Sequence, residues 1–252
     1  MSSPPPTKFL YASLPTKERL IIAAEKEIAN AGIAGMMDVD IVEDAGATSP
    51  SALRYHFKNR NQLLIAVILY RYHALAKMTS WLTTGLQQTS PPSLADYIAV
   101  RIFAKAFIVE RSMPAPYHAK MLRSLHEARI EFKDLAEEHR PWVIELCAQH
   151  EWLQQKVAEV IGMAKTHRRS RHALIFTHAG ATRLEAELRG RAQKEPIDML
   201  IPILDRQARE CANAIAAGIL REEFKPVSDE VFNAYQDAKA ELNNIGWYIE
   251  RG

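Results

Sequence analysis

Apolar residues recur along most of this chain at intervals of three and four positions, which places them on one face of an α-helix. Leu20, Ile21, Ala24 and Ile28 follow this spacing near the start. The alternation of period two that marks β-strands is absent, and so are the Asn-Gly and Asp-Gly pairs typical of hairpins. The pattern predicts an all-α protein without a β-sheet.

Glycine, proline and capping residues divide the periodic segments into separate helices. Gly32 and Gly46 stand where helices commonly end, and Pro50 stands at the first position of a short helix. Asn59 and Ser93 are expected to cap the helices that follow them. We expect helices over residues 16–31, 37–45, 50–57, 60–85, 93–111, 117–139, 142–163, 168–191, 197–220 and 228–248.

The most informative stretch covers residues 37–64 and reads MDVDIVEDAGATSPSALRYHFKNRNQLL. It predicts a short helix, a turn containing Gly46, a second short helix and then a long capped helix. This order is the helix-turn-helix layout, in which the second short helix enters the major groove of DNA.

The side chains of the second short helix and its flanks suit contact with a duplex. Small hydroxylated residues at the helix start let the backbone approach phosphates, whereas Arg can reach a guanine edge. Basic residues after the helix can neutralise phosphates. The candidate DNA-binding residues are Thr48, Ser49, Ser51, Arg54, Tyr55, His56, Lys58 and Arg60.

The same stretch resembles the tetracycline-repressor (TetR) family of bacterial regulators. The matching features are Ala31-Gly32, the run IVEDAG at residues 41–46 and the run LRYHFKNRNQL at residues 53–63. The turn before residue 53 is one residue longer than is usual in that family, and Arg54 replaces the commonest aromatic residue. The resemblance implies a homodimer that binds operator DNA and holds a small-molecule effector among its middle helices.

Three regions follow from the motif and the resemblance. Residues 1–14, rich in Pro and Ser, are expected to be a flexible arm. Residues 15–60 form the expected DNA-binding domain, and residues 61–252 the expected ligand-sensing and dimerisation domain. The first 60 residues carry seven Lys and Arg against seven Asp and Glu, so DNA binding must depend on where these charges point.

Large apolar side chains in the second region are candidates for lining an effector pocket. Such residues line ligand pockets, but they also fill ordinary cores, and core packing is the commoner role of any one of them. The candidate ligand-binding residues are Phe103, Phe107, Met121 and Phe176. Their character favours a hydrophobic or aromatic small molecule, which would release a repressor from DNA.

Small residues favour the helices at 168–191 and 197–220 as the dimer interface, because they allow helices to approach closely. The helix at 228–248 is the alternative partner. The small residues are Ala173, Ala179, Gly180 and Ala181 in the first helix, and Ala208, Ala212, Ala216 and Gly218 in the second.

The sequence contains few features that would support an enzymatic or metal-binding function. No nucleophile elbow, Walker loop or dinucleotide fingerprint occurs, and Ile130 stands where a second zinc-binding His would follow His126. No cofactor and no enzymatic activity are therefore expected. The basic run at residues 167–172 is interpreted as a solvated helix start. The alternative function is a helical binding or oligomerisation module whose hairpin is structural.

The remaining composition points to a protein of the cytoplasm. The net charge is +2, and no apolar run approaches the length of a membrane span. Cys147 and Cys211 are far apart and form no Cys-x-x-Cys pair, which suits a reducing compartment.

Overall fold

The computed structural model describes residues 13–49, 51–88, 91–113, 116–128, 141–162, 168–220 and 225–245. Within these ranges every regular element is a helix, so the all-α prediction is confirmed. The helices are α2 (Thr16–Gly35), α3 (Asp38–Asp44), α4 (Ala52–Phe57), α5 (Arg60–Gln88), α6 (Leu94–Arg111), α7 (His118–Glu127), α9 (Pro141–Val160), α10 (Arg168–Arg191), α11 (Ile197–Leu220) and α12 (Asp229–Ile245).

Most helix boundaries agree with the sequence pattern. Ser93 and Asp96 form a reciprocal capping box at the start of α6, and Asn59 accepts a hydrogen bond from the amide of Gln62 at the start of α5. Gly32 does interrupt α2, with φ at 73°, but the chain then adds one more turn. The first half of the expected helix at 117–139 is observed as α7, whereas residues 129–139 and residues 1–12 of the expected arm lie outside the described residues.

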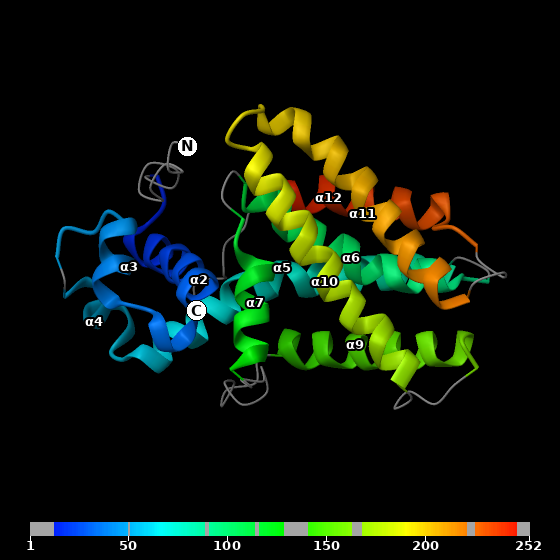
Figure 1. Cartoon of the computed structure of the whole chain (residues 1–252), viewed down its shortest axis with the longest axis horizontal. Coiled ribbons are helices and arrows are strands. Elements are labelled where there is room, and N and C mark those ends of the chain that lie inside the picture. Colours follow the sequence, from blue (N-terminus) through cyan, green and yellow to red (C-terminus); the bar gives the residue numbers. More distant parts are fainter. Residues whose placement is uncertain are drawn as a thin grey trace.

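The helices enclose two hydrophobic cores that share α5 (Figure 1). The first core joins α2, α3 and α4 to the beginning of α5, as far as Tyr70. It also takes in Tyr117, Met121 and Leu125, at and near α7. The compact N-terminal unit therefore needs part of the second region to complete its interior.

The second core surrounds α6, which lies inside the larger group of helices (Figure 1). All residues of α6 from Leu94 to Val109 are buried. On one side Phe103 stacks on Tyr235 of α12, with ring centroids 4.5 Å apart. Along the same helix, α11 supplies Ala208, Ala212 and Ala216, each with no exposed surface.

A buried ionic cluster ties α12 to α6 and α11. Nζ of Lys239 lies 2.5 Å from Oε2 of Glu110 and 2.9 Å from both carboxylate oxygens of Asp205. The hydroxyl of Tyr235 and the amide of Gln236 also donate to Asp205. One ammonium thus serves two carboxylates, and burial raises the pKa of Glu110 despite the opposing charge of Lys239.

Replacing Lys239 with Met should lower the free energy of unfolding by about 3–5 kcal/mol, because it leaves two buried carboxylates without their cation. The loss should shrink between pH 7 and pH 5, as Glu110, whose pKa burial raises, takes up a proton. Urea unfolding at several pH values measures both effects. The exposed Lys225→Met is the control, and an equal, pH-independent loss in both variants would contradict the assigned role of Lys239.

Candidate nucleic-acid interface and its junction with the helical domain

The turn between α3 and α4 is fixed by backbone hydrogen bonds. The amide of Gly46 donates to the carbonyl of Glu43, and the amide of Ala47 donates to the carbonyl of Val42. This pair of bonds is the Schellman arrangement, which needs a left-handed residue, and Gly46 has φ at 62°. The predicted stop at Gly46 is therefore confirmed, and it turns the chain toward α4.

Two serines organise the start of α4. The amide of Ser51 donates to Oγ of Ser49, and their hydroxyls lie 2.7 Å apart. The amide of Ala52 donates to the carbonyl of Ser49, so the first turn begins before the helix itself. Thr48, Ser49 and Ser51 are all exposed, as a surface that meets a duplex requires.

The six residues of α4 divide cleanly into a buried and an exposed face. Leu53 and Phe57 enter the first core, with 6% and 4% of their surface exposed. Arg54 and Tyr55 face outward, and Tyr55 is 84% exposed. With Ser51 they form a polar face that the hydrophobic anchors hold in place.

The predicted residues that follow α4 differ in their surroundings. His56 is half-buried, and burial together with the nearby Lys17 lowers its pKa. Lys58 is exposed and adopts φ at 54°, a conformation that costs a non-glycine residue about 1 kcal/mol. Arg60 donates to the carbonyls of Ile33 and Met36, both at 2.7 Å. Its guanidinium therefore ties the end of α2 to α5.

The charges of the hairpin are sorted by helix. Asp38, Asp40 and Glu43 are exposed on α3, whereas Arg54 and Lys58 lie on and after α4. Other charges of this unit are paired internally, as in the 2.7 Å contact between Lys26 and Asp44. The balance of seven positive and seven negative charges thus conceals a locally basic α4.

A buried ionic cluster joins the N-terminal unit to the helical domain. Oε2 of Glu25 in α2 accepts a 3.1 Å hydrogen bond from Nε of Arg71 in α5. Nδ1 of His118 in α7 lies 3.5 Å from the other carboxylate oxygen. Burial opposes ionisation of Glu25, but Arg71 and His118 together hold its pKa below the ordinary value. Burial lowers the pKa of His118.

Sequence reasoning missed this junction. Glu25 lies at the centre of α2, beside apolar residues. A charged residue that interrupts an apolar helix face is the one signal in the sequence that could have indicated this junction. Arg71 lies 46 residues further along the chain, so nothing local indicates the pairing.

A carboxylate of α10 holds the beginning of α7. Glu185, which has no exposed surface, accepts hydrogen bonds from the amides of Ala119 and Lys120. Arg189 donates to the carbonyl of Pro116 and lies over the ring of Tyr117. These contacts connect α10 to α7, which in turn packs against α2.

The four candidate pocket residues are not brought together. Phe103 stacks on Tyr235, and Phe107 is buried in the second core. Met121 belongs to the first core, while Phe176 is 51% exposed on α10. Phe103 and Phe107 thus share the second core, whereas Met121 and Phe176 lie elsewhere, and the assignment of all four to one effector pocket remains a prediction.

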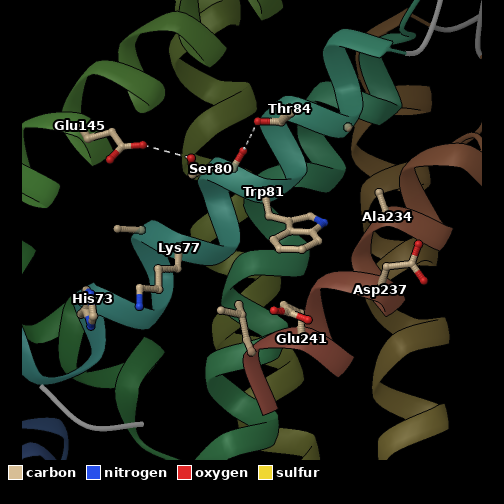
Figure 2. A pocket seen from close by; sticks show the side chains of 12 residues that line it. His73, Lys77, Ser80, Trp81, Thr84, Glu145, Ala234, Asp237 and Glu241 are labelled. Atoms are coloured by element: carbon tan, nitrogen blue, oxygen red, sulfur yellow. Dashed lines mark hydrogen bonds between the residues drawn. The ribbon is translucent and has the colours of Figure 1, made fainter. Parts of the chain in front are cut away.

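A surface groove of about 750 Å³ lies between α5, α9 and α12 (Figure 2). Trp81 projects from α5 toward Asp237 and Glu241 of α12, while Lys77 lies further along α5. On the other side Ser80 donates to Glu145 of α9. The groove contains none of the residues that the sequence predicted for ligand binding.

The described part of the chain offers neither a metal site nor a membrane span. Its His, Cys, Asp and Glu residues form no group of three or more that could hold a metal ion. None of its helices is both long and apolar enough to cross a membrane.

Comparisons with known proteins give a likeness to a solved structure. No family model and no curated protein matches the chain. Among solved structures, the chain is similar to a "putative TetR-family transcriptional regulator from Rhodococcus sp.". The TM-score is 0.41 and the sequence identity 17%, over 78% of this chain and 98% of that one.

Replacing Glu185 with Gln tests the attachment of α7 to α10. Burial raises the pKa of Glu185 from 4.5 to about 7, so the folded protein binds this proton more tightly than the unfolded chain does. The charged carboxylate therefore costs stability as the pH rises from 4.5 to 7, by up to about 3 kcal/mol.

The neutral Gln variant should lose this cost. Its free energy of unfolding relative to the wild type should increase between pH 5 and pH 8, as measured by urea titration at each pH. Subtracting the wild-type value from the variant value at each pH cancels the pH dependence of other groups, such as His118, because they are present in both proteins. A difference that stays constant across this range would show that Glu185 does not titrate there.

Proposed function

We propose that this chain is a DNA-binding transcriptional regulator that responds to a ligand, acting as a repressor that a small molecule releases. The observation that carries the proposal is the short helix α4. Its buried Leu53 and Phe57 anchor an outward face formed by Ser51, Arg54 and Tyr55. A structural hairpin has no need to expose an aromatic ring and a guanidinium beside each other.

The proposed mechanism follows from how the first core is completed. Helices α5 and α7 both belong to that core and both extend toward the helical domain. A ligand that shifts either helix would change the position of α4 in each subunit of a dimer. Two such helices must lie about 34–36 Å apart to enter successive major grooves. A ligand with higher affinity for another spacing lowers the affinity for DNA.

The proposed dimer uses α10 and α11, but only some of the small residues that the sequence indicated lie on a face open to a partner. Ala208, Ala212 and Ala216 are buried inside the subunit. A side chain at Gly180 would lie 2.5 Å from Sγ of Cys211, so this glycine serves contact between α10 and α11 within one chain. The exposed small residues Ala179, Ala186, Ala214 and Gly218 remain for a partner.

The alternative is a helical binding or oligomerisation module that does not bind DNA. The exposed acidic residues of α3 favour it, since they would face the same side as the duplex if α3 approached DNA closely. Selection of bound fragments from random genomic DNA separates the two functions, because only the regulator retains a defined sequence.

Arg54→Ala should weaken binding to the selected sequence by about 1–3 kcal/mol and relax the choice of base at one position. Lys58→Ala should weaken binding to all sequences and reduce the salt dependence by about one unit of slope for each phosphate that is no longer neutralised. Fluorescence polarisation at several salt concentrations measures both. Lys225→Ala, on the surface of the helical domain, is the matched control.

Two outcomes would revise the proposal. If Arg54→Ala keeps its sequence preference while Tyr55→Ala loses it, the longer turn has rotated α4 by one position. If none of these variants alters binding, α4 is not the recognition helix.

Gly218→Glu should convert the proposed dimer to a monomer, because a charged side chain would enter the interface. The position has open space within the subunit, so the substitution should not disturb folding. Light scattering after gel filtration measures the mass. Ala148→Glu on the exposed face of α9 is the control, and a wild-type protein that is monomeric at micromolar concentration would contradict the dimer.

A further inference from the structure

Helix α6 carries two cationic side chains into the interior of the helical domain. Arg101 is 9% exposed and Lys105 is 6% exposed. They are four positions apart, so they lie on the same face of the helix. This face differs from the one through which Phe103 stacks on Tyr235.

The groups around these two cations are neutral or themselves basic. Nζ of Lys105 lies 3.0 Å from Nδ1 of His178 in α10. Burial and the charges of Arg101 and Lys105 hold the pKa of His150 in α9 well below its ordinary value. Tyr72 of α5 is the nearby group that acts on Arg101. Four helices thus surround one concentration of positive charge.

No carboxylate in the described part of the chain pairs with Arg101 or Lys105. The buried acidic groups have other partners: Glu25 pairs with Arg71, and Glu110 and Asp205 pair with Lys239. Nε of Arg101 is inaccessible to solvent and has no hydrogen-bond partner. In contrast to the cluster at Lys239, this cluster has no counter-charge among the residues that the structure describes.

Such an arrangement is costly, because a buried charge without a counter-charge loses its hydration and gains nothing in return. Burial accordingly lowers the pKa of Arg101 to about 10, and burial together with Arg101 lowers that of Lys105 well below its ordinary value. An anion placed between them would remove this cost. His178 is exposed, so the cluster reaches the surface beside α10.

We propose that Arg101 and Lys105 form the binding site for the oxyanion group, carboxylate or phosphate, of the effector. The inference rests on the proposed regulatory function and specifies its ligand as an organic anion rather than a purely hydrophobic molecule. The guanidinium binds two oxygens of the anion in parallel, and the ammonium of Lys105 binds as a point charge. His178 positions Lys105 through their 3.0 Å contact.

The site also has a structural connection to the DNA-binding unit. Tyr72 packs against both hydrophobic cores, and its ring centroid lies 6.4 Å from that of His118. His118 in turn contacts Glu25 of α2. An anion that draws in Arg101 would therefore change the packing of Tyr72, next to the junction with α2.

The test measures the thermal unfolding of the full chain without DNA, at constant ionic strength with chloride as the balancing anion. The probes are acetate, benzoate, phosphate and sulfate, compared in the wild type, Arg101→Gln, Lys105→Gln and the control Lys225→Gln. At a concentration of about ten times its dissociation constant, an anion that binds the site should raise the midpoint of thermal unfolding by about 2–5 °C in the wild type and the control. Both site variants should lose this rise. Without anions they should unfold at the same temperature as the wild type or higher, because each removes an unpaired buried charge.

The different anions distinguish a carboxylate ligand from a phosphorylated ligand, and the variants test the site itself. A rise with acetate or benzoate alone indicates a carboxylate ligand, and a rise with phosphate or sulfate indicates a phosphorylated one. The proposal is overturned if no anion raises the midpoint in a way that depends on Arg101 and Lys105, or if both variants unfold at markedly lower temperatures. DNA binding is assayed independently, so an anion site without DNA binding would overturn the regulatory function and leave this site standing.

Discussion

A helix enclosed on all sides has no solvent-facing side to which a charged residue can turn, and α6 is such a helix. Each of its charged residues must find a partner inside the protein. Asp96 accepts hydrogen bonds from Ser93 and from Ser228, which joins the beginning of α6 to the segment before α12. Glu110, near the other end, pairs with Lys239. Asp96 and Glu110 thereby fix the two ends of α6 to the segment before α12 and to α12 itself. Arg101 and Lys105, in the middle of α6, have no carboxylate partner among the described residues.

The position of the N-terminal unit depends on a second set of buried charges. Glu25 receives contacts from α5 and α7 at once, so moving α5 would leave this buried carboxylate without its cation, and moving α7 would remove the contact with His118. Arg60 adds a neighbouring attachment, between the end of α2 and the beginning of α5. These contacts do not depend on the surface of α4. The same N-terminal unit can thus be held rigidly while α4 remains free to meet a partner.

The local features of the fold were largely predictable, because glycine stops and N-caps act over three or four residues. The bounds of α10 and α11 coincide with the predicted ranges, and Gly46 has the left-handed conformation that its place after α3 requires. Pairing over long distances was not predictable. Ala212 has the same small side chain whether it faces a partner subunit or α6, and the sequence alone does not distinguish them.

Charged residues explain most of what the sequence left open at the candidate site. Arg101 and Lys105 lie within the apolar run VRIFAKAF, but a charge is ordinarily expected to face water, so the hypothesis of a purely apolar pocket followed. Arg60 was predicted to contact phosphate because it follows α4, and no local pattern indicated that its Nη2 also donates to the carbonyls of Ile33 and Met36 at the end of α2. In both cases the side-chain type was informative, and its environment depended on elements far away in the sequence.

The uninterrupted length of α5 has a mechanical consequence. Its 29 residues span about 43 Å, and the helix extends from the first core into the second (Figure 1). If a rigid rod of this length rotates by about 5° about one end, its other end moves by about 4 Å. This displacement is close to the 3.4 Å rise between successive base pairs. On the proposed function, a small change among the distal helices would thus move α4 along the DNA by about one base-pair step.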